Sequence, residues 1–223
     1  MPVDAQFLDV AALAATVLAA VAALPQLRRL VVADDGRGVS LTGAVLGVVN
    51  EAVWVTYALH EALWSAVPEA VLMAAANAVV VVALLRLGAG ARGRAWRTAA
   101  AWAGVLAVVA AIGGAGALGV ALGAAYAVQV APAVWTAWRT ASPSGVAGAT
   151  WAMILVEAGL WGIYGVGHGD PATTVLAIVG SAAGVAMLTR KAVVRHRRRQ
   201  HPAMHRPSER PGAWAVSPLT GTG

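Results

Sequence analysis

The feature that most limits the fold of this chain is a series of long apolar stretches separated by short polar connections. Seven of them are long enough to cross about 30 Å of hydrocarbon as a helix that rises about 1.5 Å per residue. Only 12% of the 223 residues are charged, well below the share in soluble domains. We therefore predict an all-α polytopic membrane protein. The predicted spans are residues 6–30, 40–60, 66–86, 96–112, 115–139, 146–166 and 171–191.

Charge gives these spans a direction. If successive spans alternate, all sixteen Lys and Arg residues fall on one side of the membrane or in the C-terminal tail. The positive-inside rule then places the N-terminus outside and the C-terminus in the cytoplasm, and we expect the plasma membrane. Residues 192–223 are basic and polar, so we predict a disordered cytoplasmic tail that contacts anionic membrane lipid. Because the basic residues flank apolar runs, we expect no nucleic-acid partner.

The residue types argue against an enzyme. The chain has no cysteine, and three of its five histidines lie in the polar tail without forming a metal-ligating pair. We find no Ser–His–Asp series and no phosphate-binding loop in the sequence. We therefore predict no catalytic residues, no metal site and no cofactor.

The two halves of the chain repeat one pattern. A constant shift takes Pro25 onto Pro132, and the same shift takes the Trp-x-x-Tyr motif of one half onto that of the other. This recurrence predicts two three-helix units, residues 6–86 and 115–191, joined by a single linker helix at 96–112. Three helices reverse the direction of whatever follows and one extra helix restores it, so the two repeats of this 3+1+3 layout are expected to be parallel. The recurring motifs are Trp54-x-x-Tyr57 and Trp161-x-x-Tyr164, and Gly38-Val39 and Gly145-Val146.

This series of motifs resembles the PQ-loop superfamily, with the SWEET and SemiSWEET sugar transporters as the closest likeness. The dipeptide Pro25-Gln26 is followed by a short basic turn, then by GVSLTG, by Trp54-x-x-Tyr57 and by a third helix that begins with proline. The resemblance implies a membrane transporter of a small-molecule solute, a sugar in the first place, that works by alternating access. It also implies that Pro25 and Pro132 act as hinges, with Gln26 bonding a carbonyl freed by the proline. The alternative is that Pro25 merely kinks its helix.

The resemblance further implies that tryptophan and asparagine side chains line the solute site. Here Trp54 and Trp161 match the tryptophans of the family. An aromatic face suits such a site because it can pack on a sugar ring. Asn77 is the only asparagine of the third span. The repeat aligns Asn77 with Gly180, and Ser181 lies beside Gly180. The tryptophans would alternatively belong to an interfacial aromatic belt, and Asn77 would alternatively bond a neighbouring helix. Further pocket candidates are Gln129 and Tyr126.

Two carboxylic acids lie in the middle of predicted spans. Glu51 and Glu157 have no basic residue at their depth, and an ionisable group inside a membrane is a functional hypothesis by default. One interpretation is a protonated side chain that bonds a nearby carbonyl. The other is proton coupling or recognition of a solute hydroxyl.

Three functions therefore stay open. The first is a transporter of a sugar or another small polar solute, and the second is a proton-coupled PQ-loop transporter of the amino-acid type. The third is a membrane receptor or assembly protein of the same fold that transports nothing. Whether copies of the chain form a homo-oligomer is left open by the sequence.

Overall fold

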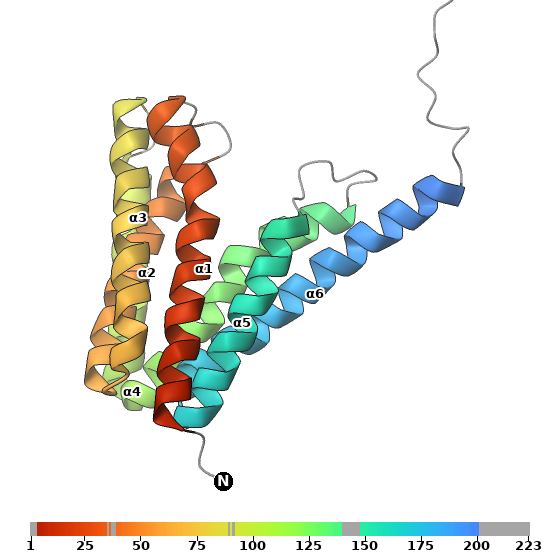
Figure 1. Cartoon of the computed structure of the whole chain (residues 1–223). Coiled ribbons are helices and arrows are strands. Elements are labelled where there is room, and N and C mark those ends of the chain that lie inside the picture. The colour runs from red at the N-terminus through yellow and green to blue at the C-terminus, as the bar shows by residue number, and fades with distance from the viewer. Residues whose placement is uncertain are drawn as a thin grey trace, which may run out of the picture.

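The fold is a bundle of long helices in a computed structural model of the chain (Figure 1). The structure describes residues 4–34, 36, 39–88, 90, 92–139 and 148–200, without the side chains of Gln26, Arg29, Pro132 and residues 197–200. Six helices in this part of the chain are long and apolar enough to cross a membrane, which confirms an all-helical chain with the character of a membrane protein. They are α1 (Ala5–Val32), α2 (Leu41–His60), α3 (Val67–Arg86), α4 (Arg92–Arg139), α5 (Gly148–His168) and α6 (Pro171–Gln200), with a 3₁₀ turn, η1, at Trp64–Ala66.

Polar caps and prolines set where several helices begin. The Asp4 side chain accepts a hydrogen bond from the Gln6 backbone N–H at 3.1 Å, and the Ser40 hydroxyl accepts one from Gly43 at 3.2 Å. These side chains satisfy backbone donors that have no partner within the helix. Pro68 lies in the first turn of α3 and Pro171 begins α6, positions where the missing N–H of proline removes no helical bond.

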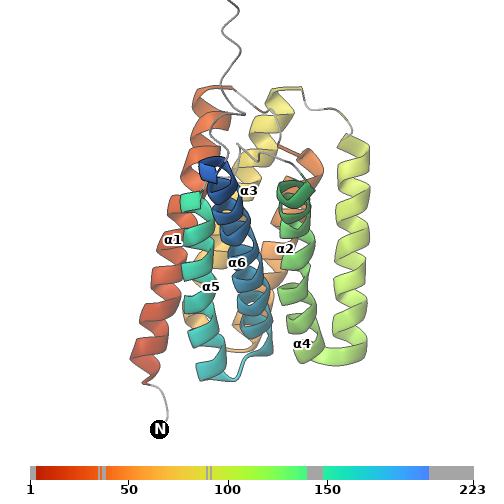
Figure 2. The same ribbon diagram turned by 90° about the vertical axis from the view of Figure 1, so that its right-hand side faces the viewer.

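Helix α4 contains a sharp turn at Gly114. Its 48 residues have one non-helical position, Gly114, with φ 67° and ψ −168°. Positive φ favours glycine, and a Cβ added to the preceding Gly113 would lie 2.4 Å from the Cβ of Ala117. The chain therefore reverses here, and Figure 2 shows the two arms of α4 running side by side in opposite directions. We call residues 92–113 the first arm and residues 115–139 the second arm. The break lies between the predicted spans 96–112 and 115–139.

The helices contact one another in a pattern that is the same in the two halves. Helix α3 packs against both α1 and α2, and α6 packs against both α4 and α5. The halves meet through two further pairs, α1 with α5 and α2 with α4. Under the predicted repeat, α1 would correspond to the second arm of α4 and α2 to α5, and the contact of α1 with α5 would then correspond to the contact of α2 with the second arm.

The apolar core has two parts that differ in what they join. One cluster lies where α1, α3 and α6 begin, and it takes buried residues from both halves, among them Leu8, Tyr57, Leu63, Tyr164 and Ala172. The second cluster lies where α1 and α3 end. It takes its buried residues from α1, α2, α3 and the first arm of α4, and none from the described parts of α5 and α6. The halves therefore share a core at one end, which we call the closed end, and separate toward the other, the open end (Figure 1).

The end of α6 differs from the prediction. The sequence places the last span at 171–191 and a disordered tail from 192, whereas α6 continues to Gln200. The physical reason is that arginine is a good helix former, so a basic segment can extend a helix that is already nucleated. The rest of the predicted tail, residues 201–223, lies outside the described residues.

Candidate functional site

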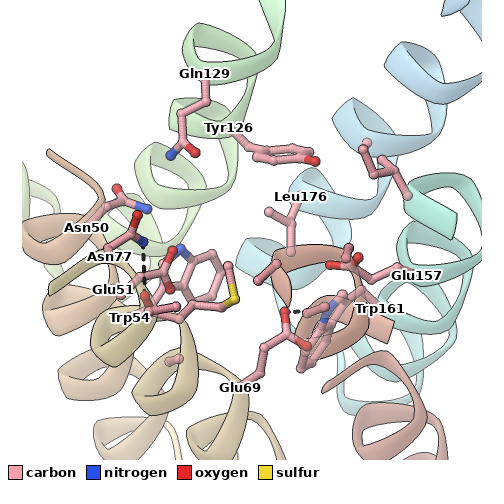
Figure 3. A pocket seen from close by; sticks show the side chains of 18 of the residues that line it. Asn50, Glu51, Trp54, Glu69, Asn77, Tyr126, Gln129, Glu157, Trp161 and Leu176 are labelled. Atoms are coloured by element: carbon pink, nitrogen blue, oxygen red, sulfur yellow. Dashed lines mark hydrogen bonds between the residues drawn. The ribbon is translucent and has the colours of Figure 1, made fainter. Parts of the chain in front are cut away.

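A cavity of about 410 Å³ lies between the halves and takes residues from all six helices (Figure 3). We call it the central cavity. Alanine and other small or aliphatic side chains form much of its wall, so its polar groups are few and stand out. The polar and aromatic residues that line it are Asn50, Glu51, Trp54, Glu69, Asn77, Tyr126, Gln129, Thr150, Glu157, Trp161 and Thr173.

Most of the site residues predicted from the sequence line this cavity. The structure brings together both tryptophans, both mid-span carboxyl groups and both predicted side-chain amides from four different helices. These six residues are Glu51, Trp54, Asn77, Gln129, Glu157 and Trp161. Tyr126 lines the cavity as well. Their joint placement is what a binding site requires, while their roles toward a solute stay predictions.

The two Trp–Tyr motifs form the same structure in each half. The rings of Trp54 and Tyr57 meet edge to face with centroids 5.8 Å apart, and those of Trp161 and Tyr164 do so at 5.4 Å. All four side chains are buried in the shared core of the closed end. The two tryptophans therefore pack inside the protein and are not part of an aromatic belt facing lipid headgroups.

A polar contact joins the halves directly beyond the tyrosines. The Tyr57 hydroxyl of α2 donates a hydrogen bond to the Asp170 carboxylate, and both residues are buried. The same carboxylate accepts from the backbone N–H of Thr173 at 2.7 Å and from its hydroxyl at 2.6 Å. Asp170 thus caps α6 and holds α2 at once. Because Thr173 also lines the cavity, this contact closes the cavity at that end.

The second half has a related contact on the opposite side. The Tyr164 side chain of α5 lies next to Ser65 of η1, and the Ser65 hydroxyl donates to the Asp9 carboxylate of α1. Each motif tyrosine therefore reaches a polar group of the other half. Sequence reasoning missed both contacts, because the tyrosine and its partner are far apart in the chain.

Glu69 is the main functional candidate that sequence reasoning missed. It falls near the start of the predicted span 66–86, and in the structure it lies in the first turn of α3 and lines the cavity. Its Oε1 atom accepts a hydrogen bond from the Trp161 indole N–H at 3.2 Å, so it links the halves (Figure 3). The signal that points to this position is Pro68, since a proline in the first helical turn places the next residue inside the helix.

Three carboxyl groups therefore share the cavity. Glu51 comes from α2, Glu69 from α3 and Glu157 from α5, and Glu69 is close enough to the other two to interact with both electrostatically. None of the described residues that line the cavity is Lys, Arg or His. In the described part of the chain no three acidic or histidine side chains are close enough to hold one metal ion.

The two asparagines of the cavity have different surroundings. Asn77 donates to the backbone carbonyl of Met73 at 3.0 Å, and its carboxamide fills the space where a Cβ on Gly47 of α2 would stand. Asn77 therefore packs between α2 and α3 and also lines the cavity, so the interhelical position and the cavity position predicted for it occur together. Asn50 is 4% exposed, and its Oδ1 atom has no hydrogen-bond partner.

The remaining predicted residues are outside the cavity wall. Ser181 is not among the lining residues, whereas its neighbour Gly180 is. Adjacent residues of a helix point about 100° apart, so only one of the two faces inward. A Cβ on Gly180 would lie 2.9 Å from the Cβ of Ala158 and 3.4 Å from the Tyr126 ring. Helix α6 therefore lies close to both α5 and the second arm at this position.

The hinge residues lie in helices that continue across them. Pro25 is inside α1, exposed, and two residues before Leu27, the last residue of α1 that lines the cavity. Position 132 is inside the second arm of α4. The side chains of Gln26 and Pro132 lie outside the described residues, so a bond from Gln26 to a freed carbonyl stays a prediction.

Comparison with known proteins yields no relative. No protein-family model and no curated protein matches the chain.

Proposed function

We propose that this chain is a membrane transporter that moves a small polar solute by alternating access between two three-helix units. In this proposal the units are α1 to α3 and the second arm of α4 with α5 and α6, and the first arm is a linker span. The two arms of α4 then count as two crossings, which gives seven spans in the 3+1+3 layout. The glycine turn and the matched helix contacts support that arrangement.

One observation carries the proposal: the central cavity lies between two units that share a core at one end only. At the closed end the halves are joined by the shared apolar cluster and by the bond from Tyr57 to Asp170. At the open end the second cluster contains only residues of the first unit and the linker, within the part of the chain that the structure describes. A solute site between two repeats, closed on one side, is what alternating access requires.

The orientation follows from the charge pattern and stays part of the proposal. If basic residues face the cytoplasm, the closed end is outside and the cavity of this structure faces inward. Solute release to the other side would then need the bond between Tyr57 and Asp170 to break and the units to meet at the open end. The plasma membrane is the expected location.

The resemblance to SWEET transporters makes a sugar the first solute to test. The size of the cavity lies in the range of small-molecule sites, and Trp54 and Trp161 offer apolar ring surface in it. Proton-coupled transport of an amino-acid-type solute is the second candidate. It is favoured by the three carboxyl groups that line the cavity, because each can bind and release a proton.

The test is solute flux in proteoliposomes with a variant that fills the cavity. Ala76 lines the cavity and Ala75 is exposed beside it on the same helix, so Ala76→Trp and Ala75→Trp are a matched pair. We expect counterflow of radiolabelled glucose, or of another solute from a panel of sugars and amino acids, that Ala76→Trp abolishes and Ala75→Trp leaves intact.

Flux that both variants preserve would show that the solute does not pass through this cavity. Absence of flux with every solute, with the protein folded in the vesicles, would favour a receptor or assembly role. A pH gradient that drives flux, and a Glu157→Gln variant that removes this drive, would select the proton-coupled alternative.

A further inference from the structure

Two fully buried polar atoms of residues that line the central cavity have no hydrogen-bond partner, and both are oxygen atoms. In the described part of the chain, buried side-chain atoms without a hydrogen bond include Asn50 Oδ1 and Glu69 Oε2, and both residues line the cavity. A carboxamide oxygen and a carboxylate oxygen are acceptors. A buried acceptor without a donor is unfavourable, so these two atoms indicate a ligand that supplies N–H or O–H groups.

The charge of the cavity narrows the ligand further. Glu51, Glu69 and Glu157 place three acidic groups on its walls, and no lining residue among those described supplies a positive charge. Charged side chains away from water are stable only when they are paired or neutralised. A cationic ligand would supply the missing counter-charge from outside the protein.

The spacing of the acidic groups separates an organic cation from a metal ion. The three carboxyl groups come from α2, α3 and α5 and surround the cavity, as Figure 3 shows, and no described group of acidic residues is tight enough for one metal ion. A cavity of about 410 Å³ is also far larger than a bare ion needs. An organic cation can span such walls, and the faces of Trp54 and Trp161 suit one because aromatic rings attract ammonium groups.

We propose that the solute of the central cavity carries a protonated amine, and that Glu69 is its anchor. The free Oε2 atom of Glu69 accepts from the ammonium group, while Oε1 stays bonded to the indole N–H of Trp161. An ammonium group has three donors and no acceptor, which suits the two buried acceptors without partners, Asn50 Oδ1 and Glu69 Oε2. Glu51 and Glu157 add charge, and Asn50 accepts from a further N–H or O–H of the solute.

This inference names the solute class for the transporter proposed above, and transport of such a solute rests on that proposal. A neutral sugar fits the same space but leaves the three carboxyl groups without a counter-charge. An amino sugar differs from its parent sugar by one ammonium group in place of one hydroxyl. Glucosamine and glucose are therefore a probe pair of equal shape and different charge.

The experiment measures binding and flux separately on the full chain. Binding of glucosamine, glucose and putrescine to purified protein in nanodiscs is followed by calorimetry, and counterflow of the same probes is followed in proteoliposomes. We expect glucosamine to bind about tenfold or more tightly than glucose, and Glu69→Gln to remove most of that difference. Glu61→Gln is the matched control, because Glu61 is exposed at the outer end of α2 and does not line the cavity.

The outcomes separate this inference from the transport proposal. Glucosamine bound no better than glucose, or equal preference in wild type and Glu69→Gln, overturns the inference, even if both sugars are transported. Selective glucosamine binding without flux supports the inference and removes the transport proposal.

Two additions keep the test decisive. Putrescine, a linear amine without a ring, is expected to bind as well, and failure of both amines to bind overturns the inference. If Glu69→Gln does not fold, as judged by thermal melting, Glu51→Gln takes its place with the same expected loss of preference.

Discussion

The two ends of the central cavity are built in different ways. At the closed end, side chains from both halves share one apolar cluster, and Tyr57 donates to Asp170 across the boundary. At the open end, Leu30, Leu41 and Leu84 bury one another within the first half and the linker. Packing at the open end therefore stabilises one unit, whereas packing at the closed end stabilises the relation between units. The difference teaches that stability and accessibility of the cavity can be altered independently.

The largest expected effect separates these two kinds of packing. Leu8 at the closed end is buried against α5, where a Cβ on Gly167 would lie 2.5 Å from it, and Leu30 at the open end is buried within the first unit. We expect Leu8→Ala and Leu30→Ala each to lower the free energy of unfolding by about 2–4 kcal/mol through lost packing. Thermal or denaturant unfolding in detergent measures this, with the exposed Leu13→Ala as a control that changes little.

Only one of the two variants should also open the cavity from outside. The chain has no cysteine, so Ala22→Cys in the cavity wall supplies a single reporter for a membrane-impermeant thiol reagent. Faster labelling from outside is expected with Leu8→Ala and not with Leu30→Ala. Equal labelling rates in Leu8→Ala and Leu30→Ala would mean that packing at the closed end controls access to the cavity no more than packing at the open end does.

An intermediate effect is expected from the bond that crosses the closed end. Tyr57→Phe removes the hydroxyl that donates to Asp170 and keeps the ring that packs on Trp54. A hydrogen bond to a charged group contributes about 1.5–3 kcal/mol, so in the proposed alternating-access mechanism the balance should shift about tenfold or more toward a form that opens at the closed end. Labelling of the Ala22→Cys reporter from outside should rise accordingly.

The corresponding variant in the other half gives the comparison. Tyr164→Phe removes a hydroxyl that lies next to Ser65, without a bond to a capping carboxylate. We expect a smaller rise in labelling than with Tyr57→Phe. A larger rise would mean that the Asp9 and Ser65 side is the stronger closure.

The smallest effect is expected at the predicted hinge. Pro25→Ala restores a backbone hydrogen bond that α1 lacks, so the helix should bend less readily and solute flux should slow several-fold, with little change in unfolding. Pro68→Ala is the control, because Pro68 lies in the first turn of α3, where no backbone bond is missing. Flux unchanged by Pro25→Ala, and likewise by Pro132→Ala, would contradict the hinge.

Patterns of local sequence were sufficient to predict the helices and much of the cavity wall. The apolar runs indicate where the helices lie, and the repeated Trp-x-x-Tyr motif indicates which positions face the other half. Asn77 and Gln129 could be found because polar side chains are rare in such runs. Each of these inferences uses short segments of sequence, either one alone or two compared with each other.

The rest depended on contacts between distant residues. Asp170 pairs with Tyr57, and Glu69 pairs with Trp161, through approaches that no local pattern records. Ser181 and Gly180 are neighbours on α6, and only Gly180 lines the cavity. The repeat indicates this pair of residues but not which of the two faces inward. The basic composition of residues 192–200 predicts disorder, but the helix propensity of arginine extends α6 to Gln200.

The position of the glycine turn has a mechanical consequence. Ala95 and Ala99 of the first arm are buried with residues of α1, α2 and α3, so in the proposed 3+1+3 layout the linker and the first unit would form one body that faces the second unit. The covalent joint between these two bodies is the turn at Gly113 and Gly114, on the side of the closed end (Figure 2). Spreading the bodies at the far end therefore does not stretch the chain. Spreading them at the near end requires backbone rotation in a two-residue segment that only glycine can occupy.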